Sequence, residues 1–268
     1  MQNNKQKKNS QKSKEKFSLF NPDAAGIDIG GAFHFVAVPE DRADNPIRKF
    51  NNFTEDLCQL ADWLSACGIK TVAMESTGVY WIPIYEILES RGFEVFLVNA
   101  RHVKNVPGRK SDVLDCQWIQ QLHSYGLLRA SFRPDQDICQ LRSYMRQRES
   151  LIQYAANHVQ HMQKALAQMN VQLANVVDDI TGITGMKIIR AIISGERSPE
   201  KLASHRDGRC KQSKEVIAKS LYGNYRDEHM FALQQAVELF DVYRDKIAAC
   251  DRSVEKVLNQ LAPNKQKK

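Results

Sequence analysis

The first hundred residues alternate short apolar runs with helical periods. Five runs are rich in β-branched or aromatic residues and are bounded by turn-forming residues, which is typical of strands. They span residues 24–30, 32–40, 46–52, 70–76 and 93–99. The first three follow one another through short turns, so an antiparallel meander is predicted.

Two helical stretches separate the later strands. Residues 54–68 and 80–92 place apolar positions three to four apart, and each ends at a glycine. Thr54 is the expected N-cap of the first stretch, and Gly68 and Gly92 are the expected stops. Strands and helices in this order predict an α/β fold, in which a mixed sheet carries helices on its faces.

The pattern changes at about residue 135, where the strand signal ends. Residues 135–169 and 226–261 are two long stretches without Pro or Gly, with apolar residues recurring at spacings of three and four. That spacing is close to a heptad seam, so we expect an all-α region built on long antiparallel coiled-coil helices. The alternative is a compact helical bundle, because short helical pieces lie between the two stretches.

Charge separates the ends of the chain from its body. The formal net charge of the 268 residues is +7, but the first 20 residues hold six lysines against one glutamate, and the last five hold three lysines. Residues 1–22 and 264–268 are therefore predicted to be disordered basic tails, which either bind polyanions or only aid solubility. Residues 23–134 and 135–263 are the expected domains.

Cysteines and hydropathy point to a cytoplasmic protein. No apolar run approaches the length of a membrane span, and the polar start of the chain lacks the apolar core of a secretory signal. The six cysteines form no CxxC pair, which favours free thiols over a zinc cluster or a disulfide framework. We expect no membrane partner.

Four acidic residues stand at the ends of predicted elements. Asp28 ends the first strand and Glu75 ends the fourth, while Asp112 and Asp115 lie three apart at the start of a helix. Brought together, such carboxylates can hold two divalent cations of the kind used in phosphodiester chemistry. Hard oxygen ligands favour Mg²⁺ or Mn²⁺.

Each acid also has a purely structural interpretation. Asp112 and Asp115 suit the first turn of a helix, where the helix dipole favours negative charge. Asp28 precedes glycines and fits a tight turn, and Glu75 fits a helix cap. Their joint position at element ends favours the metal interpretation.

Basic residues surround the predicted acidic site. Residues 99–110 include Arg101, Lys104, Arg109 and Lys110. Such side chains contact phosphates in nucleic-acid complexes.

Further candidate contacts lie elsewhere in the chain. Arg142 and Arg146, four apart on the first long helix, either follow a nucleic-acid backbone or form a solvated face. Tyr80 and Trp81, soon after Glu75, either stack on a base or pack in the core.

Three segments resemble a known family. "GIDIGG" with Asp28, "MESTGVYW" with Glu75 and "GRKSDVLDCQWI" with Asp112 and Asp115 resemble the DEDD transposases of a group of bacterial insertion sequences. The resemblance covers about residues 24–130. It implies a ribonuclease-H-like, RuvC-like fold and Mg²⁺-dependent recombination of DNA, with the four acids as catalytic metal ligands.

The resemblance implies partners as well. Family members form oligomers, partly through the helical arm, and use a structured bridge RNA to choose their DNA. It also implies a cytoplasmic protein that acts at the nucleoid. Members carry a C-terminal domain with a DNA-linking serine, whereas this chain ends in "APNKQKK". We therefore expect a truncated or frame-shifted product, and no serine is assigned.

Two other functions stay open at the level of sequence. Actin-like and sugar-kinase ATPases open with a similar "GIDIGG", although they continue with Thr and Lys where this chain has Ala32 and Phe33. The second is a non-catalytic, regulatory fragment that binds nucleic acid.

Overall fold

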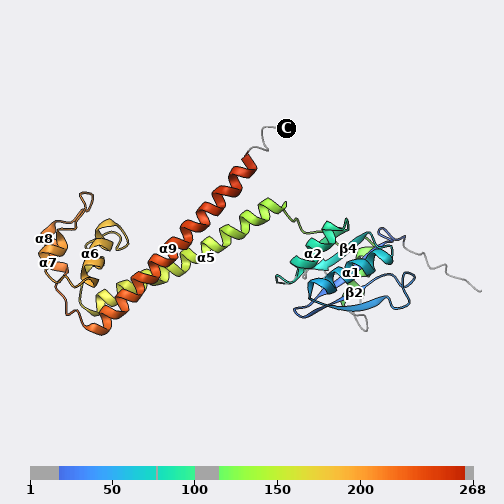
Figure 1. Ribbon diagram of the computed structural model, residues 1–268, viewed down its shortest axis with the longest axis horizontal. Coiled ribbons are helices and arrows are strands. Elements are labelled where there is room, and N and C mark those ends of the chain that lie inside the picture. Colours follow the sequence, from blue (N-terminus) through green and yellow to red (C-terminus); the bar gives the residue numbers. More distant parts are fainter. Residues whose placement is uncertain (1–17, 77, 100–114, 263–268) are drawn as a thin grey trace, which may run out of the picture. The chain divides into compact units, whose positions relative to one another are not determined.

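The computed structural model describes residues 18–76, 78–99 and 115–262. The chain divides into two compact units, one up to Arg133 and one from Pro134 (Figure 1). Among these residues no helix combines the length and the apolar character that crossing a bilayer requires.

The first unit is built on a five-stranded mixed sheet of order β3-β2-β1-β4-β5. Its strands are β1 (Ala24–Ile29), β2 (Phe33–Ala37), β3 (Ile47–Asn51), β4 (Thr71–Glu75) and β5 (Glu94–Val98). β1, β2 and β3 pair antiparallel, which confirms the predicted meander. β4 and β5 join β1 in parallel, so the chain must cross over the sheet between them.

The two crossovers are α1 (Thr54–Ala66) and α2 (Trp81–Ser90), and both pack on one face of the sheet. Ile27 of β1 and Met74 of β4 are fully buried on this face with Leu60 of α1. The prediction that Thr54 caps α1 is wrong. The N-cap is Phe53, whose backbone is extended and whose side chain cannot accept a hydrogen bond, and Thr54 already lies in the helix.

The opposite face of the sheet is covered by α4, described over Asp115–Ser124. Ala73 of β4 and Val98 of β5 are buried there with Ile119 and Leu122 of the helix. Helices therefore cover both faces, as the predicted mixed α/β fold requires.

The second unit contains only helices. Two long helices, α5 (Gln136–Gln168) and α9 (Asp227–Leu261), lie side by side (Figure 1). Their contacts show an antiparallel pair, since Tyr154 and His158 of α5 meet Tyr243 of α9, while Arg148 meets Asp251. Between them come η1 (Leu173–Asn175), α6 (Ile183–Ile193), α7 (Pro199–Ala203) and α8 (Lys214–Ser220).

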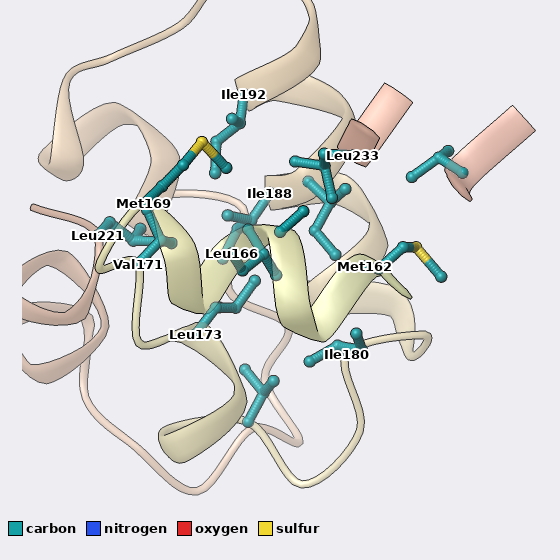
Figure 2. Packing of buried hydrophobic residues seen from close by; sticks show 14 of the residues in the cluster. Met162, Leu166, Met169, Val171, Leu173, Ile180, Ile188, Ile192, Leu221 and Leu233 are labelled. Atoms are coloured by element: carbon teal, nitrogen blue, oxygen red, sulfur yellow. The ribbon is translucent and has the colours of Figure 1, made fainter. Parts of the chain in front are cut away.

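The core of this unit gathers where the short helices meet the long pair. Met162 and Leu166 of α5 point into a cluster with Ile188 of α6 and Leu233 of α9 (Figure 2). Met145, one of the apolar positions of the predicted seam, is instead about half exposed. The described unit thus combines both sequence interpretations, a long helix pair and a compact bundle that packs against part of it.

Candidate active site at the sheet edge

Two of the predicted acids lie next to each other on the central strands. β1 and β4 pair in parallel with Ile27 opposite Met74, so Asp28 and Glu75 come next in the same register. Side chains at equal register on neighbouring parallel strands point to the same face of a sheet. Both acids are half-buried.

The face to which they point is the one covered by α4. Gly26, two residues before Asp28, packs so closely on this helix that a Cβ would lie 2.3 Å from the carbonyl oxygen of Cys116 and from the amide nitrogen of Gln120. A glycine inside a strand is often the mark of such a close backbone approach. The alternation of β1 therefore turns Asp28 toward the start of α4.

Asp115, the first described residue of α4, is exposed and precedes the fully buried Cys116. Burial raises the pKa of the Cys116 thiol to about 11, and the charges of Asp28 and Asp115 also raise it. Asp28 and Asp115 are thus both close enough to the Cys116 thiol for their charges to raise its pKa. Asp28 and Glu75 are thus neighbours on the sheet, and Asp115 lies at the start of the helix that covers the same face.

The turn that follows Asp28 is held by two side chains that sequence reasoning missed. The amide of Asn52 donates to the carbonyl oxygens of Gly30 (3.1 Å) and Gly31 (2.8 Å). The backbone N–H of Gly30 donates to Nδ1 of His34 at 3.4 Å. Burial lowers the pKa of His34 to about 4, so its ring is neutral at pH 7 and Nδ1 is able to accept. The alternation of buried and exposed side chains along β2 could have marked His34 as buried. Its spacing in the sequence does not reveal that it accepts from the N–H of Gly30.

The comparison with known proteins gives the family. Residues 25–171, more than half of the chain, match a transposase family, the DEDD transposases of the IS110 type. The chain belongs to this family. No curated protein matches it. The chain is therefore a transposase, of a class that cuts and transfers DNA. The match spans the sheet from Ala25 onward and α5.

Several predicted residues of the transposase site lie outside the described residues. These are Asp112, Arg101, Lys104, Arg109 and Lys110. Arg142 and Arg146 belong to the other unit, on an exposed face of α5. Only Asp28, Glu75 and Asp115 can therefore be placed at the sheet edge.

The donor chemistry of this edge suits a hard divalent cation, since carboxylate oxygens are the ligands that Mg²⁺ and Mn²⁺ prefer. Within residues 18–76, 78–99 and 115–262, however, no group of three or more His, Cys, Asp or Glu side chains is placed so that it could hold a metal ion. The three described acids do not form a complete site by themselves. A cation held there needs a further ligand.

Proposed function

We propose that this transposase cleaves and transfers DNA strands by divalent-metal chemistry at the edge of the sheet. Asp28, Glu75, Asp112 and Asp115 are the proposed catalytic ligands, and Mg²⁺ or Mn²⁺ is the proposed cofactor. The observation that supports this most directly is the shared register of Asp28 and Glu75 on the face where α4 begins with Asp115.

Three of the proposed ligands lie within the described residues, and two kinds of element hold them. Asp28 and Glu75 are fixed by the sheet, so the distance between their backbones is set by strand pairing rather than by a loop. Asp115 comes from a helix whose distance from β1 is fixed by the close contact at Gly26. Divalent cations held by these carboxylates would supply activation of the attacking oxygen and stabilisation of the leaving oxygen of a phosphodiester.

The test replaces single acids in the full chain. Glu75→Gln and Asp28→Asn keep the shape of the side chain but remove the charge that a cation requires. We expect each to lower the rate of Mg²⁺-dependent DNA strand cleavage by roughly 10²-fold or more, since metal stabilisation amounts to several kcal/mol. A gel assay on labelled DNA measures the rate.

Glu94→Gln is the matched control, because Glu94 is exposed and begins β5 beside Thr71, at the opposite end of the strands from Glu75. It should cleave like the wild type. Wild-type rates in both Glu75→Gln and Asp28→Asn would contradict the proposal. DNA binding without cleavage at any Mg²⁺ concentration would favour the regulatory alternative instead.

The structure offers an explanation of the glycines that does not involve nucleotide binding. A Cβ on Gly30 would lie 2.4 Å from the carbonyl oxygen of Phe33 in the same turn, and Gly31 faces the ring of Tyr80. Close packing within the protein therefore accounts for Gly30, whereas a Cβ on Gly31 would make only ordinary contact with the ring of Tyr80. Together with the family match, this favours the transposase over the actin-like or sugar-kinase ATPase.

We also propose that α5 contacts the nucleic-acid backbone through Arg142 and Arg146. Both side chains are exposed, whereas Arg148 on the same helix binds Asp251 of α9. Each arginine replaced by alanine should reduce the dependence of log affinity on log salt by about one. Arg148→Ala is the control, and an equal change in its salt dependence would contradict the assignment.

Two further parts of the proposal come from the family resemblance. They are a structured guide RNA as a second nucleic-acid partner and self-association through the pair α5 and α9. Leu258 and Val242 of α9 are about half exposed, which gives the pair apolar surface for a second copy. Light scattering measures the mass of the particle with and without the RNA, and so tests RNA binding and self-association. A monomer under all conditions would contradict self-association.

A further inference from the structure

We propose that the ring of Tyr80 is a stacking platform for an unpaired base of the DNA that enters the acidic site. This inference rests on the proposed function, because it supplies the contact that positions the DNA strand beside the carboxylates. Tyr80 precedes α2 as its N-cap residue and is 50% exposed.

The ring of Tyr80 lies next to the segments that follow both central strands, β1 and β4. Ring atoms of Tyr80 lie 3.5–3.8 Å from where a Cβ on Gly31 would stand. The ring lies equally close to Gly78, where the corresponding distances are 3.6 and 3.7 Å. Gly31 follows Asp28 by three residues, and Gly78 follows Glu75 by three. The aromatic ring therefore lies against the two chain segments that leave β1 and β4 just after the acids.

This placement limits the distance between the ring and the site. Three residues span at most about 10 Å of chain. A base stacked on Tyr80 would therefore belong to a nucleotide close to the phosphate at the carboxylates.

Hydrogen bonds hold the two glycines that lie beside the ring. The indole Nε1 of Trp81 donates to the carbonyl oxygen of Gly78 at 3.1 Å. On the other side, the amide of Asn52 holds the carbonyl oxygen of Gly31 at 2.8 Å. A preformed platform loses little conformational entropy when a base binds.

Core packing, the alternative use of this aromatic residue, applies to its neighbours instead. Trp81 and Tyr85 pack edge to face and belong to the core beneath α1 and α2, whereas Tyr80 does not. Phe33 lies at the same end of the sheet, but the ammonium of Lys49 stands 3.7 Å from its ring centre and occupies that face. Tyr80 therefore keeps aromatic surface for a ligand at this edge.

The occupant is assigned to DNA because the family acts on DNA. Stacking on an aromatic side chain tolerates any base, since each base has a π-face. Stacking uses the face of the Tyr80 ring and does not need its phenol oxygen. Phenylalanine should therefore replace Tyr80, while alanine should not.

The experiment uses the full chain and a DNA oligonucleotide with one unpaired 2-aminopurine, in EDTA so that no cleavage occurs. Stacking on an aromatic ring quenches 2-aminopurine fluorescence. The wild type and Tyr80→Phe should quench the probe, whereas Tyr80→Ala should not and should bind roughly 5- to 150-fold more weakly. Tyr125→Ala is the matched control, because Tyr125 is 46% exposed and follows α4 at the far end of that helix.

Three results would contradict the stacking proposal or its assignment to DNA. Unchanged quenching in Tyr80→Ala, or an equal loss in Tyr125→Ala, overturns the proposal. A larger effect of Tyr80→Ala on an RNA oligonucleotide of the same sequence overturns the assignment to DNA. Cleavage by Glu75→Gln at the wild-type rate would count against the proposed function alone, because the quenching measured in EDTA does not depend on it.

Discussion

The two units of the chain differ in how they use buried polar groups. The sheet unit buries two histidines, His34 and His123, and positions acids at the ends of its central strands. The core of the helical unit is built from aliphatic side chains, methionines and Phe240, with only Thr184 and Ser220 as buried polar residues among those described. The difference indicates that the sheet unit carries the proposed chemistry, whereas the helical unit is an apolar framework.

The family match divides the molecule differently. It covers the sheet unit from Ala25 onward together with α5, and it ends at Val171, before α6 to α9. The proposed site and the exposed arginines of α5 thus lie within the matched residues. The bundle formed by α6, α7 and α8 lies outside them.

The two units can be followed separately in solution. All three tryptophans, Trp63, Trp81 and Trp118, belong to the sheet unit, so tryptophan fluorescence reports its unfolding. Far-UV circular dichroism is dominated by the long helices α5 and α9. A change that affects one unit should therefore move one signal more than the other.

The largest effect is expected from Leu166→Ala in the helical core. Leu166 is 1% exposed within the cluster around α5, so the substitution leaves a cavity and should cost about 2–5 kcal/mol. The dichroism midpoint in urea should fall, while the fluorescence midpoint should not. Leu239→Ala, at a 43% exposed position of α9, is the control and should change little. Equal losses in both variants would contradict the assigned core.

Acid should destabilise the sheet unit more than the helical unit. Burial lowers the pKa of both His34 and His123 to about 4, from 6.5 in the unfolded chain. The unfolded state therefore binds protons that the folded state excludes. The contribution of the two neutral histidines to stability is therefore full above pH 6.5 and is lost as the pH falls from 6.5 to about 4.

Urea unfolding followed by fluorescence at pH 7 and pH 4.5 measures this loss. His123→Gln should be less stable at pH 7, because Nε2 of His123 lies 2.8 Å from the hydroxyl of Thr71, but its stability should vary less with pH. A wild-type midpoint that is independent of pH would be inconsistent with neutral buried histidines.

A smaller effect is expected where α4 meets β1. In Gly26→Ala the added Cβ would meet backbone atoms of α4 at 2.3 Å, so the helix must move, at a cost of about 1–3 kcal/mol. Because Asp115 moves with α4, DNA cleavage should fall as well. Gly208→Ala, which meets nothing within 4 Å, is the control in the other unit. Wild-type stability in Gly26→Ala would disprove the close approach.

The smallest effect is expected from the ion pair between the long helices. Arg148 donates from Nε to Asp251 at 2.5 Å, but both side chains are partly exposed. Such pairs contribute about 0–1 kcal/mol, so Arg148→Ala should barely change the dichroism midpoint. A double-mutant cycle with Asp251→Ala measures the coupling, and a value well above this range would show that the pair is shielded from water.

Local patterns were sufficient to predict most elements. The five strands, α1, α2, α5 and α9 were predicted within a few residues, because each repeats an apolar period that its own burial requires. The N-cap of α1 was predicted wrongly at Thr54, since a favourable capping residue can also be tolerated one position inside the helix. Phe53 and Thr54 are neighbours, and the capping preference of threonine was not enough to show which of them is the N-cap.

The sequence by itself determined which residues are chemically able to serve, namely acids at the ends of strands and at a helix start. Only the tertiary structure decided that Asp28 and Glu75 share a register, because strand pairing joins positions that are far apart in the chain. It also decided that Gly26 is the contact point of α4 and that Tyr80 faces two glycine turns. The spacing of buried residues within one strand or helix is a local property, so it is visible in the sequence. Which residues become neighbours across a sheet depends on which strands pair and in what register.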